Sequence, residues 1–181
     1  IQFITPRDVS NCDLGKCYYI LLTGEDGGII NDAVLLRLND EQFWVSPGDG
    51  DVLLWIEGVA VNSGMDVNVF EPDVSPLQMG GPKSPHVMYE LFGDLAIDLG
   101  YYRAAQTEVN GIPLVLGRTG WSGELSYELY LQDGSRGNEL WGLVAKAGEK
   151  YNIKPAAPQL IRSIEGELLS YASDISRTDN P

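Results

Sequence analysis

Apolar and polar residues alternate in short runs along this chain, and clusters of glycine, proline and polar residues separate the runs. Such alternation is typical of strands with one buried face. A run at 18–23, a turn cluster at 24–28 and a second run at 29–38 predict a hairpin, because glycines accept the positive φ of a tight reversal. Further strands are expected at residues 42–46, 65–70, 74–79, 101–109, 112–116 and 126–131.

Four other segments have apolar residues at helical spacing or helix-start signals, at residues 52–62, 86–92, 138–151 and 159–169. We expect Asp51 to cap the first helix and Ser84, followed by Pro85, to cap the second. Hairpins interleaved with helices predict an α+β fold, in which antiparallel or mixed sheets pack against helices. The order of elements starts again near residue 72, which we take as a domain boundary between 1–72 and 73–181.

Composition and charge exclude several classes of protein. The 181 residues are 44% hydrophobic and 21% charged, as in ordinary soluble globular proteins. A net charge of −14 with scattered Lys and Arg argues against a nucleic-acid partner. No run is apolar for long enough to span a membrane, so we expect a cytoplasmic protein. The chain begins within an element at Ile1 and its last residues close none, which indicates an internal fragment of a longer protein.

The standard catalytic motifs are absent from the sequence. It has no P-loop, no dinucleotide fingerprint and no nucleophilic Ser elbow. His86 is the single histidine, and Cys12 and Cys17 have no further Cys or His near them. We therefore expect no metal site and two reduced, buried cysteines.

Two carboxylates stand out from this background. Asp32 lies in an apolar run, where a buried carboxylate needs a partner or shifts toward its neutral form, so it is either functional or paired locally at the turn. Glu128 shares a strand face with Tyr130, after a glycine-punctuated loop that carries Trp121. It either offers an acceptor to a flat, N–H-rich heterocycle or faces solvent from an edge strand.

Three blocks of sequence resemble the folate-binding region of the glycine-cleavage T-protein (aminomethyltransferase) superfamily. Tyr19 followed by GGIIND at 27–32 is similar to the family's Tyr and GGIIDD. LQMGGPK at 77–83 is similar to LxVQGPK, and RTGWSGE at 118–124 with Glu128 is similar to RTGYTGE followed by Glu. The resemblance covers nearly the whole chain.

The family's fold surrounds a central tetrahydrofolate with three lobes. The resemblance therefore implies a partial ferredoxin-like folate-binding lobe at 1–72, a second folate-binding lobe at 73–181, and no C-terminal barrel in this chain. It implies that Glu128 binds the pterin edge, because an ionised carboxylate only accepts hydrogen bonds, and that Tyr19 lines the folate site. Asn31 and Asp32 are implied as the catalytic residues near N5 of the folate.

Two further residues are candidates for cofactor binding by the same resemblance. Arg162 is a candidate partner of the folate glutamyl carboxylate, or else a surface arginine on an amphipathic helix. Trp121 is a candidate wall of the folate and donor site, because an aromatic ring attracts a sulfonium cation.

Asn31 departs from the family pattern, since aminomethyltransferases have Asp there. An amide beside N5 suits direct methyl transfer, which needs mainly alignment and desolvation. The sequence around it is most similar to the dimethylsulfoniopropionate demethylase-like branch. We therefore expect a tetrahydrofolate-dependent methyltransferase that takes the methyl group of a small sulfonium or methoxy donor. The alternatives are a glycine-cleavage aminomethyltransferase and a folate-binding protein without turnover.

Overall fold

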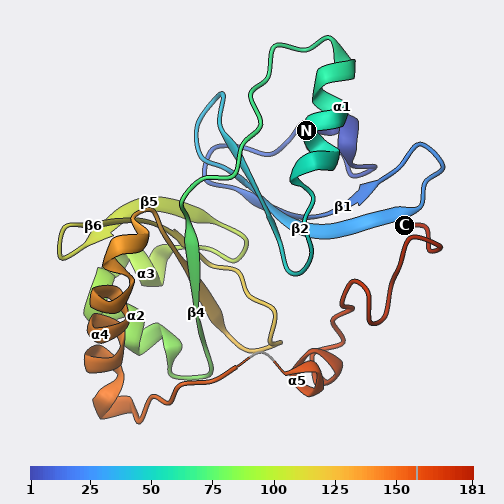
Figure 1. Ribbon diagram of the computed structural model, residues 1–181. Helices are drawn as coiled ribbons and strands as arrows, with labels where there is room; N and C mark the ends of the chain where they lie inside the picture. Colours follow the sequence, from blue (N-terminus) through green and yellow to red (C-terminus); the bar gives the residue numbers. More distant parts are fainter. Residues whose placement is uncertain (158) are drawn as a thin grey trace. The chain divides into compact units, whose positions relative to one another are not determined.

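Figure 1 shows the protein as a computed structural model, which describes residues 1–157 and 159–181. The chain divides into two compact units, a first unit of Ile1–Pro72 with Leu169–Pro181 and a second unit of Asp73–Leu168. The division after Pro72 lies where the order of elements starts again in the sequence. Residues 169–181 belong to the first unit, so the expected second lobe of 73–181 is too long at its C-terminal end.

The first unit is built on a three-stranded antiparallel sheet of order β1-β2-β3. Its strands are β1 (Cys17–Thr23), β2 (Ile29–Arg37) and β3 (Phe43–Pro47), as the alternating runs predict. A short η1 (Gln2–Ile4) and the helix α1 (Leu53–Ser63) complete it. The core contains side chains from one sheet face together with half-buried residues of α1, among them Ile20, Leu22, Ala33, Leu35, Trp55 and Val59. Cys12 and Cys17 are buried, as expected.

Local contacts explain where the first unit agrees with the sequence and where it differs. The N-cap of α1 is Val52 rather than the predicted Asp51, whose carboxylate accepts the N–H of the first helical residue, Leu53, at 2.8 Å from one position further back. The strand expected at 65–70 is wrong, because this segment pairs with no strand and the side chains of Met65, Val67 and Phe70 are exposed. The C-terminal segment joins the unit through the Ile29 N–H, which donates to Asp179 O at 3.0 Å, and through an ion pair between Arg177 and Asp26.

The second unit is built on a four-stranded antiparallel sheet of order β4-β7-β6-β5. Its strands are β4 (Ser75–Gly80), β5 (Ala104–Val109), β6 (Ile112–Gly117) and β7 (Ser126–Leu131). The tight turn between β5 and β6 places Asn110 and Gly111 at φ angles of 51° and 70°, as the Asn-Gly pair predicts. Since β7 lies between β4 and β6, the edge-strand interpretation of Glu128 is wrong.

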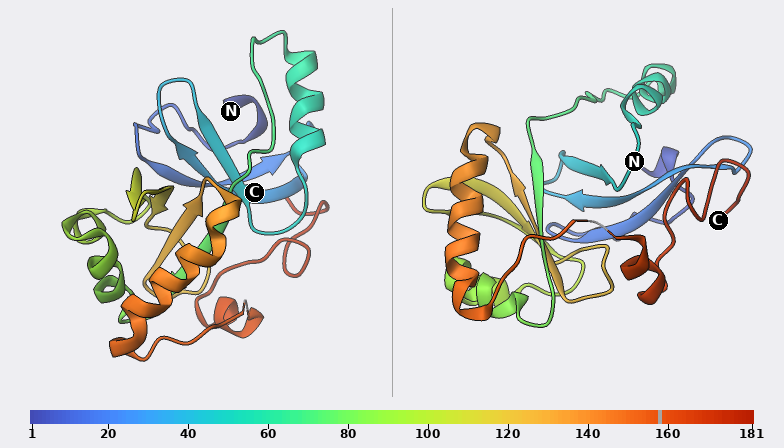
Figure 2. Two further views of the ribbon diagram at one scale, coloured as in Figure 1. Left: turned by 60° about the vertical axis from the view of Figure 1, so that its left-hand side comes forward. Right: turned by 60° about the horizontal axis from the view of Figure 1, so that its bottom comes forward.

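Helices cover one face of this sheet, as Figure 2 shows for α2 and α4. The helices on this face are α2 (Ser84–Phe92), α3 (Asp94–Asp98) and α4 (Gly137–Gly148), with the short η2 (Gly134–Arg136) and η3 (Glu149–Tyr151) beside them. The last helix of the unit, α5 (Leu160–Glu165), packs against residues 121–123 instead. The core under α2 and α4 contains Met88, Leu116, Tyr127, Leu129 and Leu140. In the described residues no helix has the length and apolar character needed to cross a membrane.

Two details of the second unit differ from the sequence expectations. Ser84 is the first residue of α2 rather than its cap, and its buried hydroxyl donates to Leu125 O at 2.7 Å. Its side chain is therefore used to hold the chain before β7. The sequence pattern does not predict α3. Gly93 ends α2 at a φ of 58°, and α3 follows at once with only five residues, which is too short for a helical periodicity to be recognised.

Candidate functional site

Glu128 lies at the centre of a small polar cluster in the second unit. Its Oε2 accepts hydrogen bonds from the Thr119 hydroxyl and from the Tyr130 hydroxyl, the latter at 2.9 Å. Thr119 and Tyr130 are buried, whereas Glu128 is half-buried. Within the described part of the chain, Oε1 of Glu128 makes no hydrogen bond. We call these three residues the Glu128 cluster; it fixes the carboxylate and leaves one of its oxygens as an acceptor.

The sheet register and one glycine make room for the Glu128 cluster. Glu128 lies opposite Gly117 on β6, and Tyr130 follows two residues later on the same face. A Cβ atom at Gly117 would lie 3.0 Å from Thr119 Oγ1 and 3.3 Å from the Tyr130 ring. A side chain at this position would therefore push the two hydroxyl donors away from the carboxylate.

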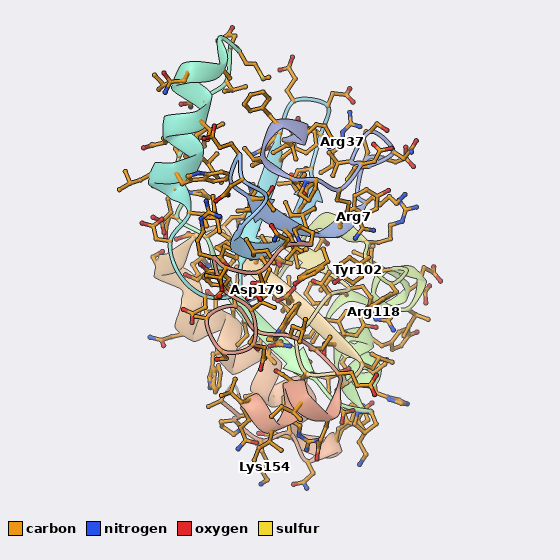
Figure 3. The ribbon with its side chains drawn as sticks, turned by 90° about the vertical axis from the view of Figure 1, so that its right-hand side faces the viewer. Arg7, Arg37, Tyr102, Arg118, Lys154 and Asp179 are labelled. Carbon is orange, nitrogen blue, oxygen red and sulfur yellow. The ribbon has the colours of Figure 1, made fainter. Side chains whose placement is uncertain are left out.

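Arg118 anchors the start of the loop at 118–125, which connects β6 to β7. Its guanidinium donates to Leu99 O at 3.2 Å and lies 5.1 Å from the centre of the Tyr127 ring. Its carbonyl accepts the N–H of Tyr102 at 3.1 Å, and both residues are labelled in Figure 3. Arg118 therefore holds the loop from the core side, while the next residue, Thr119, reaches Glu128.

The other end of this loop packs against α5. The Trp121 carbonyl accepts the Ser163 hydroxyl at 3.5 Å. Gly123 and Gly166 approach so closely that a Cβ atom on Gly123 would lie 2.9 Å from the Gly166 Cα. Trp121 is half-buried in this arrangement. Its position relative to Glu128 is therefore set by a loop fixed at both ends.

Arg162 lies on α5 and takes part in surface ion pairs. Its Nη1 lies 3.4 Å from Glu124 and 3.6 Å from Glu165, and its side chain is 55% exposed. Ion pairs this exposed contribute little to stability. Arg162 is thus exposed and paired with two acidic side chains, and its contact with the folate glutamyl carboxylate stays a prediction.

Tyr19 and Asp32 form the polar pair of the first unit. The Tyr19 hydroxyl donates to Asp32 Oδ2 at 3.1 Å across β1 and β2. Asp32 is buried, and this burial raises the pKa of its carboxyl, while the hydrogen bond from Tyr19 opposes the rise. Asp32 therefore pairs with a tyrosine across the sheet rather than with a turn residue, and Oδ1 is left free of that bond.

Asn31 points away from this pair. It lies opposite Leu22, a core residue, whereas Asp32 lies opposite Leu21, and neighbours in a strand face opposite sides. The Asn31 amide donates to Asp49 O at 2.7 Å, and its Oδ1 accepts the N–H of Asp32 at 2.8 Å. The buried Asn31 therefore ties the segment before α1 to β2. Asn31 and Asp32 therefore face opposite sides of β2, and their place near N5 of the folate stays a prediction.

Sequence reasoning missed the groups that support Glu128. Thr119 and Gly117 lie outside the strand pattern, and their role follows from the pairing of β6 with β7, which the sequence does not state. Strand alternation places Tyr130 on the face of Glu128, but the hydrogen bond from its hydroxyl to Glu128 is known only from the structure. In the described residues no group of three or more His, Cys, Asp or Glu side chains could hold a metal ion.

Comparison with known proteins identifies relatives over the whole chain. The family model described as the GCVT N-terminal domain matches residues 1–181. The dimethylsulfoniopropionate demethylase DmdA of Ruegeria pomeroyi is 35% identical over 181 residues, which are 100% of this chain and 50% of that protein. An aminomethyltransferase of Corynebacterium aurimucosum is 33% identical over 193 residues, which cover 99% of this chain and 52% of that protein. The chain thus spans about half the length of the curated relatives it matches.

A solved structure supports the fold assignment. The crystal structure of glycine cleavage system aminomethyltransferase T from Bartonella henselae matches with a TM-score of 0.77 at 19% identity, over 98% of this chain and 48% of that one. At this identity the match shows the fold alone. It confirms the predicted α+β fold of the T-protein type, and the family match confirms the resemblance drawn from the three sequence blocks.

Proposed function

Because this chain belongs to the GCVT N-terminal domain family, we propose that it is the folate-binding part of a tetrahydrofolate-dependent transferase of one-carbon groups. The observation that carries the proposal is the fixed carboxylate of Glu128 with its unoccupied Oε1. A pterin ring presents an amino group and a ring N–H side by side. A carboxylate is suited to both, since it only accepts hydrogen bonds.

The residues present fit tetrahydrofolate. Both donors to Glu128 are neutral hydroxyls bonded to its other oxygen, so no cation competes for the negative charge within the Glu128 cluster. Tyr130 brings an aromatic ring next to the carboxylate of Glu128, which suits a flat heterocycle. Hydrogen bonds from the pterin N–H groups to the ionised carboxylate of Glu128 would be about twice as strong as bonds between neutral groups.

For the donor we propose a small sulfonium or methoxy compound that gives up a methyl group. The identity of 35% to a protein named as a dimethylsulfoniopropionate demethylase supports this choice. Tetrahydrofolate, when bound, supplies the nitrogen nucleophile N5. A methyl group that leaves a sulfonium leaves a neutral thioether behind, and the proton it replaces on nitrogen must go to a base.

Asp32 is our candidate for that base. Burial raises the pKa of its carboxyl, so it holds a proton more readily than an exposed aspartate does. The Tyr19 hydroxyl orients Oδ2 and leaves Oδ1 free of that bond. Asn31 stays our second candidate near N5; its amide donates to Asp49 O and its Oδ1 accepts the backbone N–H of Asp32.

Aminomethyl transfer is the second candidate function. The identity of 33% to an aminomethyltransferase supports it. Both candidates use the same carboxylate for folate, and they differ in the donor and in the product. A folate-binding protein without turnover is the third.

Product analysis separates these candidates. The full-length protein is incubated with tetrahydrofolate and either dimethylsulfoniopropionate or an aminomethyl-carrying donor, and the folate products are separated by chromatography. We expect 5-methyl-tetrahydrofolate from the sulfonium. Formation of methylene-tetrahydrofolate from the aminomethyl donor alone would assign the second function. Binding of folate measured by calorimetry with no product from either donor would leave the third.

A further inference from the structure

Gln78 is the residue that faces Glu128 from the neighbouring strand. It lies directly opposite Glu128 in the register of β4 and β7. Residues opposite one another on antiparallel strands share a face, with Cβ atoms about 5 Å apart. Gln78 is exposed, and in the described residues its carboxamide makes no hydrogen bond. A free amide therefore stands beside the free oxygen of the Glu128 cluster.

The loop at 118–125 lies next to both of these side chains. Thr119 holds the carboxylate of Glu128, and the next residue, Gly120, lies against the amide of Gln78. A Cβ atom at Gly120 would lie 3.0 Å from Gln78 Nε2 and 2.9 Å from Ser126 Oγ. The bare backbone of Gly120 therefore leaves the space in which the Gln78 amide lies.

The two groups have complementary hydrogen-bonding character. Glu128 offers only an acceptor, and the carboxamide of Gln78 offers two donors and an acceptor. The edge of a 4-oxo pteridine carries an amino group and a ring N–H, followed by the carbonyl oxygen at position 4. A ligand whose donors meet Glu128 therefore brings its carbonyl next to that carboxylate, where it needs a donor.

We propose that Gln78 supplies this donor, and that the pair of Gln78 and Glu128 selects 4-oxo pteridines over 4-amino pteridines. The proposal rests on the proposed function and adds the residue that reads the carbonyl. A buried polar group without a partner costs binding free energy, so a site that meets the carbonyl with a donor rejects a ligand edge that does not fit.

A charge change at Gln78 tests the proposal. Calorimetry on the full-length protein measures the dissociation constants of tetrahydrofolate and of its 4-amino counterpart for the wild type, Gln78→Glu and Gln78→Leu. A glutamate accepts from a 4-amino group but repels a 4-oxo group. We expect Gln78→Glu to lower the preference for the 4-oxo ligand by about 10-fold or more, and Gln78→Leu to weaken tetrahydrofolate binding by about 5- to 10-fold.

Gln132 is the matched control, because it is an exposed glutamine of the same unit, one residue beyond β7. Gln132→Glu carries the same charge change and should leave the preference unchanged. If the wild type and Gln78→Glu prefer the 4-oxo ligand over the 4-amino ligand to the same degree, the proposed role of Gln78 is wrong, although the protein still binds folate. A wild-type protein that binds neither ligand would overturn the proposed function instead.

Discussion

At the scale of single residues, the two carboxylates of interest are held in different ways. Glu128 is half-buried and receives two hydroxyl donors on one oxygen. Asp32 is buried and receives one side-chain donor, from Tyr19. The first arrangement fixes an acceptor for a ligand. The second favours the protonated carboxyl and so suits proton transfer.

The raised pKa of Asp32 predicts a pH-dependent stability. A carboxyl whose pKa is raised by folding stabilises the folded state below its unfolded pKa, and this contribution is lost as the pH rises through the raised value. Asp32→Asn keeps an acceptor for Tyr19 and removes the titration. We therefore expect the melting temperature of the variant, relative to that of the wild type, to increase as the pH rises above about 4. A melting-temperature difference between variant and wild type that does not change with pH would contradict a raised pKa of Asp32.

Asn31 leads to a prediction about the residue that the family has there. Asn31→Asp replaces the amide that donates to Asp49 O with a second acceptor, so two oxygens would face each other in a buried place. We expect a loss of about 1–3 kcal/mol in the free energy of unfolding, measured by urea denaturation.

Asn62→Asp is the control for this change. The Asn62 amide also donates to a backbone carbonyl, that of Gly58, but it is exposed on α1. Water can replace this hydrogen bond, so we expect a change within about 0.5 kcal/mol. Equal losses in the two variants would show that Asn31 has no special role in holding the segment before α1.

At the scale of elements, the junction of the 118–125 loop with α5 depends on two glycines. A Cβ atom on Gly123 would lie 2.9 Å from the Gly166 Cα, and Gly123 has a φ of 68°. We expect Gly123→Ala to cost about 1–3 kcal/mol of unfolding free energy and to weaken folate binding, because the loop also carries Thr119. Gly142→Ala is the control. It lies in α4 with open space around it and should stabilise the protein by about 0.5–1 kcal/mol. A Gly123→Ala variant as stable as the wild type would contradict the close approach.

The elements also show how far the sequence reaches. Alternation located β7 and the faces of Glu128 and Tyr130, because a strand period of two depends only on the residues of the strand itself. It did not reveal that β7 is a central strand, since strand order depends on pairing with β4 and β6. The same limit explains the alternating run at 65–70, which has the pattern of a strand but no partner in the structure.

The site shows a similar boundary between what is local and what is not. The three sequence blocks located Tyr19, Asp32 and Glu128, which all lie in polar clusters. Strand alternation already places Asn31 and Asp32 on opposite faces, so their separation follows from a rule that the family resemblance did not apply. The partners of Glu128 on the neighbouring loop and Gln78 on β4 follow only from the sheet register.

At the scale of the whole molecule, the chain consists of two units that each have a sheet and a core of their own. Residues 169–181 return to the first unit and give its β2 an additional hydrogen bond, between the Ile29 N–H and Asp179 O. The net charge of −14 is that of the entire chain, and its basic residues are scattered. We therefore expect no attraction to an anionic polymer such as nucleic acid.

The net charge predicts a salt dependence of stability. Repulsion among 26 acidic residues, against 12 basic ones, destabilises the compact state and is screened by salt. We expect the melting temperature to rise when sodium chloride is increased from about 20 mM to about 200 mM, over which the Debye length falls roughly threefold. A fall in melting temperature would mean that the surface ion pairs, such as Lys150 with Glu90, outweigh the repulsion.

The central claim is that Glu128 binds the pterin ring, and folate affinity tests it most directly. Isothermal titration of the full-length protein with tetrahydrofolate compares the wild type with Glu128→Ala and with Glu149→Ala, a control at an exposed glutamate of η3. We predict that Glu128→Ala weakens binding by about 30- to 100-fold, the equivalent of about 2–3 kcal/mol for hydrogen bonds to a charged group. Glu149→Ala should change the affinity little. Unchanged folate affinity in Glu128→Ala would contradict the claim.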